Sequence, residues 1–174
     1  MSNSLLFLQL ALERAKECIP TPSAFCVGCV ITVPHSTSDV PIVLETGFSR
    51  ELPGNTHAEA NALTKARSLT SQKLSELLGE ESPPEIEELL KNADVYTTME
   101  PCSVRLSGLA PCADALIEAN VRRCIIGVGE PADFVKCEGA TKLQAAGIEV
   151  VWVSGLEEEC LEVARRGHPP VVAA

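Results

Sequence analysis

The second half of the chain alternates short apolar runs with segments of helical pattern, and this alternation limits the fold more than any other feature. A β-branched run, a helix and another such run are typical of a right-handed crossover between parallel strands. Residues 94–165 repeat this unit. The predicted elements are strands at Asp94–Thr98, Arg123–Gly127 and Ile148–Val153, and helices at Pro111–Ala119, Ala140–Ala146 and Leu156–Arg165.

The first half of the chain adds a hairpin to this sheet. Two β-branched runs separated by a short Pro/Ser turn indicate an antiparallel pair. The acidic stretch Ser68–Lys91 has apolar residues at helical spacing and a break at Ser82-Pro83-Pro84, so we expect an insertion of two short surface helices. The other predicted elements are helices at residues 3–18 and 57–67 and strands at Cys26–Val33 and Pro41–Thr46. Together they predict one α/β domain over residues 1–174, a three-layer α/β/α sandwich with a five-stranded mixed sheet.

The charge of the chain limits its partners. Its formal net charge is −10 and its pI is about 4.8. A protein that follows phosphate backbones or anionic membranes needs many Lys and Arg residues, so neither nucleic acid nor a membrane is expected as a partner. A small phosphorylated ligand needs only a few basic residues and stays compatible with this charge.

Eight cysteines in 174 residues raise the question of disulfides. Cys26, Cys29 and Cys124 lie in apolar runs, where a free thiol behaves as a small buried hydrophobe. The first apolar run lacks a basic flank and continues as an amphipathic helix, which is unlike a signal peptide. We therefore expect a reducing compartment, the cytoplasm, with the nucleus reachable by diffusion.

Two short segments have the composition of a catalytic metal site. They are Thr56-His57-Ala58-Glu59 and Glu100-Pro101-Cys102, and Pro111-Cys112 follows the second. One His and two Cys leave a fourth position of zinc open for water, as in catalytic zinc sites. Thr56 is a candidate N-cap and Pro111 a candidate first helical residue, so two helix N-termini would point at one metal.

Each of these residues also has a structural interpretation. Thr56-x-x-Glu59 fits a capping box, in which Glu59 would bond back to the Thr56 amide. A histidine at a helix start is commonly a cap or a surface residue, and Cys102 and Cys112 could be buried thiols. The whole set in this order favours zinc, with Glu59 off the metal as the group that carries protons from water to a leaving amine.

His57-Ala58-Glu59 and Glu100-Pro101-Cys102 resemble the motifs of the cytidine deaminase-like superfamily. Within it, nine residues between Cys102 and Cys112 are more than the usual two. The segments 97–103, 110–117 and 142–150 resemble the riboflavin-biosynthesis pyrimidine deaminases, and the resemblance extends from about Ala11 to Val153. It implies a zinc-dependent hydrolase acting on 2,5-diamino-6-ribitylamino-4(3H)-pyrimidinone 5′-phosphate, and a homo-oligomer, expected as a dimer.

The chain also departs from the bacterial members of that family. It has Ala24-Phe25-Cys26 where they carry Asn-Pro, and its loop after Ser103 lacks their histidine. The bacterial enzymes continue into a reductase domain, whereas this chain resembles the standalone fungal type. Deamination of a free base or nucleoside (cytosine, cytidine or guanine) stays open as an alternative, as does a non-catalytic zinc-stabilised module.

Several polar residues are candidate substrate contacts around the expected mouth of the site. In an acidic chain, basic residues near the motifs are candidates for the phosphate, although each could equally be a solvated surface charge. Arg105 is favoured, because its loop is tethered by two metal ligands. The candidates are Arg50, Asn55, Ser103, Arg105, Ser107 and Lys136.

Overall fold

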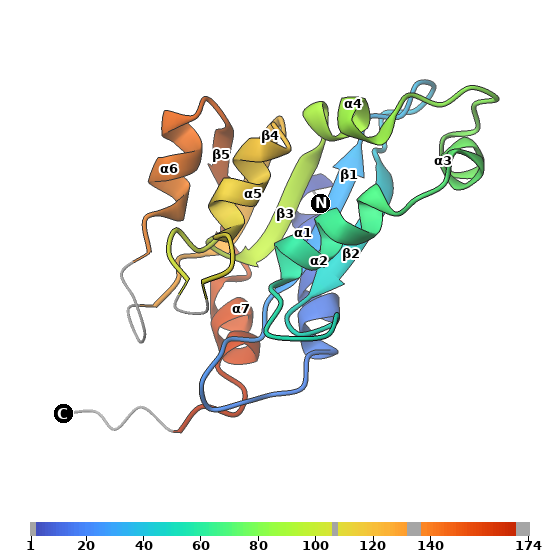
Figure 1. The fold of residues 1–174 in the computed structure, drawn as a ribbon. Coiled ribbons are helices and arrows are strands. Elements are labelled where there is room, and N and C mark those ends of the chain that lie inside the picture. Colours follow the sequence, from blue (N-terminus) through green and yellow to red (C-terminus); the bar gives the residue numbers. More distant parts are fainter. Residues whose placement is uncertain (1–2, 106–107, 132–136, 170–174) are drawn as a thin grey trace.

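The computed structural model describes residues 3–105, 108–131 and 137–169. Its centre is a five-stranded sheet in the order β2-β1-β3-β4-β5. β1 pairs antiparallel with β2 and β3, whereas β3, β4 and β5 are parallel (Figure 1). The strands are β1 (Gly28–Val33), β2 (Ile42–Phe48), β3 (Asp94–Met99), β4 (Arg123–Val128) and β5 (Glu149–Trp152).

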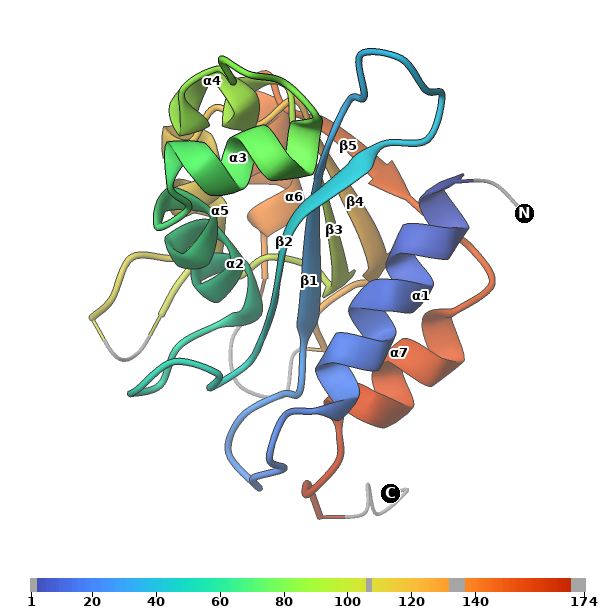
Figure 2. The ribbon, with the colours of Figure 1, turned by 90° about the vertical axis from the view of Figure 1, so that its right-hand side faces the viewer.

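Helices cover both faces of this sheet (Figure 2). α1 and α7 lie on one face, and α2, α5 and α6 lie on the other with α3 and α4 beside them. The helices are α1 (Asn3–Lys16), α2 (Ala58–Arg67), α3 (Ser71–Leu78), α4 (Ile86–Lys91), α5 (Cys112–Glu118), α6 (Gly139–Ala145) and α7 (Glu157–Ala164). The predicted three-layer sandwich with a five-stranded mixed sheet is confirmed.

Strand periodicity explains the two cores. Successive side chains of a strand point to opposite faces, so the fully buried β1 feeds both layers. Ile31 and Val33 pack in the larger core with α2 and α5, whereas Val30 packs with Phe7 and Tyr96 beneath α1. β1 is therefore buried on both faces, which matches its continuous run of mostly apolar residues in the sequence.

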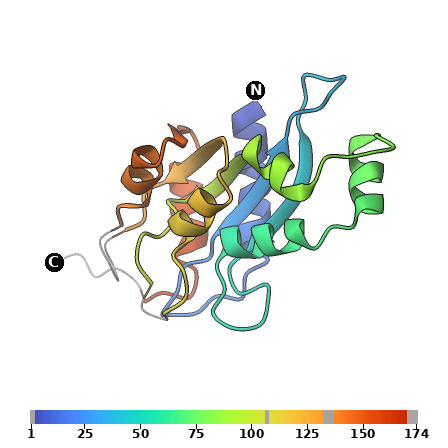
Figure 3. The ribbon, with the colours of Figure 1, turned by 45° about the horizontal axis from the view of Figure 1, so that its top comes forward.

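Some predicted boundaries are corrected by long-range contacts. The first strand begins at Gly28 and not at Cys26, because the Cys26 amide donates to the Ala164 carbonyl at the end of α7. The second strand continues to Phe48, two residues beyond the predicted end. The two helices expected in the 68–91 insertion are α3 and α4, and α3 lies at the β2 side of the sheet (Figure 3).

No helix in the described part of the chain combines the length and the apolar character needed to cross a bilayer. All eight cysteines are free thiols.

Candidate metal centre and its pocket

His57, Cys102 and Cys112 come together at the carboxyl end of β3. His57 directly precedes α2, Cys102 follows β3, and Cys112 is the first residue of α5. The segments are joined by main-chain contacts, since the Ala113 amide donates to the Cys102 carbonyl. Two helix N-termini therefore meet at this edge of the sheet, which is where ligands bind in α/β folds.

The local cap differs from the predicted one. His57 itself occupies the N-cap position of α2, in extended conformation and without a side-chain cap bond. The Thr56 hydroxyl donates to the Leu52 carbonyl instead, so the predicted Thr56 cap is wrong. As a result the imidazole of His57 precedes the helix and is directed at the two sulfur atoms.

The distances in this group fit a zinc ion. Nδ1 of His57 lies 3.5 Å from Sγ of Cys102 and 3.5 Å from Sγ of Cys112, and all three donor atoms lie within 4.8 Å of one another. Tetrahedral zinc with Zn–N near 2.0 Å and Zn–S near 2.3 Å would separate nitrogen and sulfur by about 3.5 Å. One nitrogen and two sulfur donors suit zinc and leave one coordination position for a water molecule.

The electrostatics of the cysteine pair favour a bound cation. The Cys112 thiol donates a hydrogen bond to the Cys102 sulfur, and this contact is the main reason why the pKa of Cys102 is lowered to about 4. Hydrogen bonds from His57 and from the Cys112 amide, whose nitrogen lies 3.3 Å from the Cys102 sulfur, lower it further. The same shared proton, together with burial, raises the pKa of Cys112 well above its ordinary value. One thiolate and one thiol thus share a proton, which a divalent cation would displace.

Glu59 lies beside this group without belonging to it. It is 3% exposed, and its Oε1 accepts a hydrogen bond from the Thr97 hydroxyl at 3.3 Å. Burial raises the pKa of the Glu59 carboxyl, with the negative charge of Cys102 as the second cause. A carboxyl whose pKa is raised holds a proton more readily than an ordinary glutamate, which suits a group that takes up and releases protons beside a metal site.

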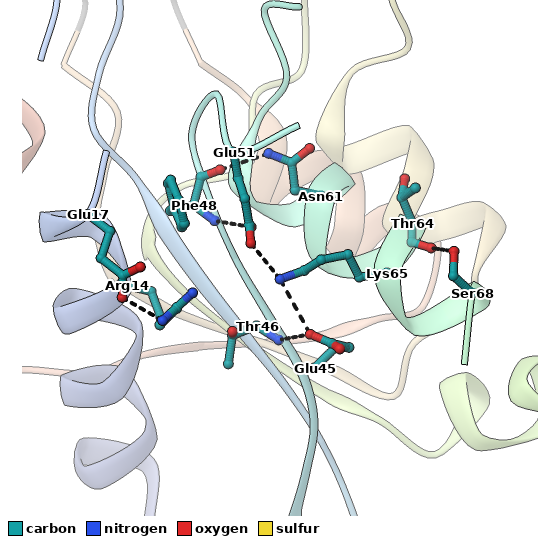
Figure 4. A network of polar contacts seen from close by, with 10 residues as sticks. All are labelled: Arg14, Glu17, Glu45, Thr46, Phe48, Glu51, Asn61, Thr64, Lys65 and Ser68. Carbon is teal, nitrogen blue, oxygen red and sulfur yellow. Dashed lines mark hydrogen bonds and ion pairs between the residues drawn. The ribbon is translucent and has the colours of Figure 1, made fainter. Parts of the chain in front are cut away.

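A network of polar contacts fixes α2, the helix that contains Glu59 and directly follows His57 (Figure 4). Lys65 lies 2.7 Å from Oε1 of Glu51 and 3.5 Å from Oε2 of Glu45. The buried Asn61 donates to the Phe48 carbonyl at 2.7 Å. Because Phe48 ends β2, these contacts tie α2 to that strand and to the loop that follows it.

A pocket of about 210 Å³ opens beside the metal group. His57, Glu59 and Cys102 line it, together with several apolar side chains. The apolar lining residues are Ala24, Phe25, Val27, Met99 and Val104.

Three of the predicted substrate contacts line this pocket: Arg50, Asn55 and Arg105. Arg105 donates to the Asn55 carbonyl, so the loop between the cysteines touches the loop before His57. The Arg50 guanidinium donates to the carbonyls of Ile19 and Phe25. These two bonds use much of its capacity to donate hydrogen bonds to a ligand.

The other predicted contacts lie elsewhere. Ser103 does not line the pocket, and its hydroxyl accepts a hydrogen bond from the Glu138 amide ahead of α6. Ser107 and Lys136 lie outside the described residues.

Two pocket carboxyls were not predicted as site residues. Glu100 accepts a hydrogen bond from the Ala140 amide at 2.9 Å and so supports the start of α6. Glu130 follows β4 and also faces the pocket. Its position could have been predicted, because the carboxyl ends of neighbouring parallel strands meet at the same edge of the sheet.

Comparisons with known proteins agree with this site. A diaminohydroxyphosphoribosylamino-pyrimidine deaminase of Schizosaccharomyces pombe is 40% identical over 164 residues, which cover 94% of this chain and 35% of that protein. A chloroplastic riboflavin biosynthesis protein PYRD of Arabidopsis thaliana is 35% identical over 88% of this chain and 30% of its own length. This chain therefore spans about a third of the length of these curated relatives.

A solved structure matches over nearly the whole chain. The Rib2 deaminase of Aspergillus oryzae, a C-terminal deletion mutant, has a TM-score of 0.79 and 34% identity, with 96% of this chain and 93% of that chain covered. The model of the cytidine and deoxycytidylate deaminase zinc-binding region matches residues 1–128, a range that includes His57, Cys102 and Cys112. The chain thus belongs to the cytidine and deoxycytidylate deaminase zinc-binding family.

Proposed function

We propose that this protein is a zinc-dependent hydrolase that deaminates 2,5-diamino-6-ribitylamino-4(3H)-pyrimidinone 5′-phosphate in riboflavin biosynthesis. The observation that carries this proposal is the convergence of a His/Cys/Cys group and a buried, non-ligating glutamate in one pocket. The substrate class is supported by the relatives, which include a pyrimidine deaminase and an Aspergillus oryzae Rib2 deaminase crystallised with DARIPP.

The roles within the site follow from its chemistry. His57, Cys102 and Cys112 would hold the zinc, which when bound supplies Lewis-acid activation of water. Glu59 takes one proton from that water and passes it to a ring nitrogen, and it then carries the second proton from the new C–OH group to the departing amino group. Water adds to the ring carbon that bears the 2-amino group and ammonia leaves, so the product is the 5-amino-6-ribitylaminouracil phosphate.

The substrate contacts belong to the same proposal. Arg105 and Asn55 stand at the pocket wall and are suited to the phosphate and to the polar ribityl chain. Arg50 shapes the wall through its bonds to Ile19 and Phe25. Ser103 fixes the loop after β3 through its contact with residue 138. Ser107 and Lys136 stay predicted contacts.

The wider setting is also proposed. We place the protein in the cytoplasm as a homodimer, with residues 1–174 as a single deaminase domain. The eight free thiols are compatible with a reducing compartment. Light scattering of the zinc-loaded protein would measure the oligomeric state.

Substitution of Glu59 by Gln tests the function. The variant keeps the size of the side chain but cannot accept the proton, so we expect ammonia release to fall by about 10²–10⁴-fold. Zinc content should stay at the wild-type level, because Glu59 is no ligand. Equal turnover in both proteins would contradict the proposed role of Glu59.

A substrate panel separates this function from its alternative. The wild-type protein is assayed for ammonia release with the ribitylaminopyrimidine phosphate, cytosine, cytidine and guanine. Preference for an unphosphorylated base or nucleoside would favour the alternative deaminase. A zinc-loaded wild-type protein that deaminates none of them would indicate a non-catalytic module.

A further inference from the structure

The carboxyl of Glu130 is left without an assignment by the proposed chemistry. It lies two residues beyond the end of β4 and lines the same pocket as Glu59, His57 and Cys102. Its Oε2 is buried and has no hydrogen-bond partner in the part of the chain that the structure describes. The other two pocket carboxyls are engaged, Glu59 by the Thr97 hydroxyl and Glu100 by the Ala140 amide.

The surroundings of Glu130 do not neutralise it. Within the described residues, no Lys, Arg or His forms an ion pair with this carboxyl, and the Cys137 thiol is its one side-chain hydrogen-bond donor. Burial raises the pKa of Glu130, and the negative charges of Cys102 and Glu59 add to the effect. A buried carboxyl oxygen without a donor costs free energy that a bound ligand with an N–H group would recover.

We infer that Glu130 is a specificity-determining residue whose carboxylate accepts a hydrogen bond from a second amino group of the pyrimidine, the one that does not leave. The unprotonated oxygen of a carboxyl group is an acceptor, so it selects a ring substituent that donates. The proposed substrate loses its 2-amino group at the metal and keeps its 5-amino group as such a donor. This inference rests on the proposed function.

The same contact would explain discrimination against simpler substrates. Cytosine and cytidine have one exocyclic amino group, and that group is the one released as ammonia. With either of them bound, Oε2 of Glu130 would stay buried without a partner. A site with a buried polar group disfavours a ligand that fails to satisfy it.

The test is a binding cycle with two ligands and the zinc-loaded protein. The ligands are 5-amino-6-ribitylaminouracil 5′-phosphate, which is the proposed product, and the same molecule without its 5-amino group. Affinities are measured by calorimetry for wild type, Glu130→Met, which removes the acceptor, and Glu130→Gln, which removes the charge. Glu158→Gln, on the exposed side of α7, controls for the change in net charge.

We expect wild type to bind the amino ligand about ten- to a hundredfold more tightly than the desamino ligand, as for a hydrogen bond to a charged group. Glu130→Met should bind both ligands equally, with wild-type affinity for the desamino ligand, and Glu130→Gln should lie between. Zinc content and melting temperature confirm that each variant is folded, and the Glu158 variant should match wild type.

Two results would overturn the assignment in different ways. If wild type deaminates the ribitylaminopyrimidine phosphate but Glu130→Met weakens both ligands by the same factor, the role of Glu130 is wrong and the proposed function stands. A folded wild-type protein that neither binds nor deaminates the ribitylamino compounds would remove both proposals.

Discussion

The hydroxyl of Thr97 lies 3.3 Å from Oε1 of Glu59 and 2.9 Å from the carbonyl oxygen of Met99. A hydroxyl has one proton and two lone pairs, so a Thr97 that donates to Met99 can accept a hydrogen bond from a protonated Glu59. Thr97 therefore holds the glutamate in place in both of its protonation states. Its side chain is fully buried, so water does not compete for this contact.

Substitution of Thr97 by Val is expected to lower kcat by about three- to tenfold, the value of one net hydrogen bond, with KM nearly unchanged. Thr97→Ser keeps the hydroxyl and should restore most of kcat. Steady-state ammonia release, normalised to zinc content, is the measurement. A Val variant with wild-type kcat would show that Glu59 needs no such support.

Removal of zinc should expose one reactive cysteine. Because the pKa of Cys102 is lowered to about 4, its sulfur is a thiolate at every pH above that value and loses its charge as the pH falls through it. Iodoacetamide at pH 6 is therefore expected to label Cys102 through the pocket in chelator-treated protein, and zinc should block the reaction.

Two other cysteines serve as internal controls for this labelling. Burial raises the pKa of Cys137 to about 12, so its thiol should not react at pH 6. The pKa of Cys26 is lowered to about 6, chiefly by the Cys18 thiol, but its side chain is fully buried. Peptide mass mapping locates the label, and equal labelling of Cys102 with and without zinc would argue against its role as a ligand.

Arg50 is expected to matter for stability. Its guanidinium donates to the carbonyls of Ile19 and Phe25 and lies 2.8 Å from the Cys18 sulfur, so it joins the loop before β1 to the loop after β2. Arg50→Ala removes these two hydrogen bonds to carbonyls and should lower the free energy of unfolding by about 1–3 kcal/mol. Urea denaturation measures this change.

The same variant separates two roles of Arg50. If Arg50 only contacts the substrate, Arg50→Ala should raise KM and leave the urea midpoint unchanged. If Arg50 holds the pocket wall together, the same substitution should lower the urea midpoint. The residue also adopts a positive φ of 64°. Arg50→Gly and Arg50→Ala both lack the guanidinium, so the difference between them measures the backbone contribution.

Gly47 sets how closely α2 approaches the sheet. A Cβ atom at this position would lie 2.3 Å from the Ala58 carbonyl oxygen and 2.7 Å from the Ala62 amide nitrogen, which are main-chain atoms of the helix. Gly47→Ala should therefore displace α2, with a loss of about 1–3 kcal/mol in stability and weaker zinc binding.

Gly129→Ala is the matched control for this substitution. Its nearest neighbour would be Glu100 Oε2 at 3.9 Å, an ordinary contact, so its stability should stay close to that of wild type. If both variants unfold at the same urea concentration, the close approach at Gly47 has no energetic role.

The alternating pattern made most of the fold predictable, because strand and helix periods are local properties of the chain. β1 and β3 are buried on both faces, and both are rich in the β-branched and aromatic residues typical of such strands. The metal group was predictable for a related reason, since each ligand lies at the end of a predicted element. The start of α2 was less predictable. The Thr56 hydroxyl donates to the Leu52 carbonyl, so His57 and not Thr56 is the N-cap residue.

The pocket wall could not be predicted from the sequence in the same way. The contacts of Arg50 depend on how the loop of residues 18–26 folds beneath it, and nothing in the spacing of the residues encodes that approach. Ser103 likewise turns toward residue 138, on a segment 35 positions away in the chain. Glu130 has no motif around it, and only its place at the carboxyl end of a parallel strand could have indicated it.

The positions of the ligands along the chain link metal supply to folding. His57 is separated from Cys102 by 45 positions and from Cys112 by 55, so the three converge only in the native state. A ligand that binds only the folded form stabilises it by about 1.4 kcal/mol for each tenfold excess over its dissociation constant. The zinc concentration in the cell would then determine how much of the protein is folded, as well as how much of it is active.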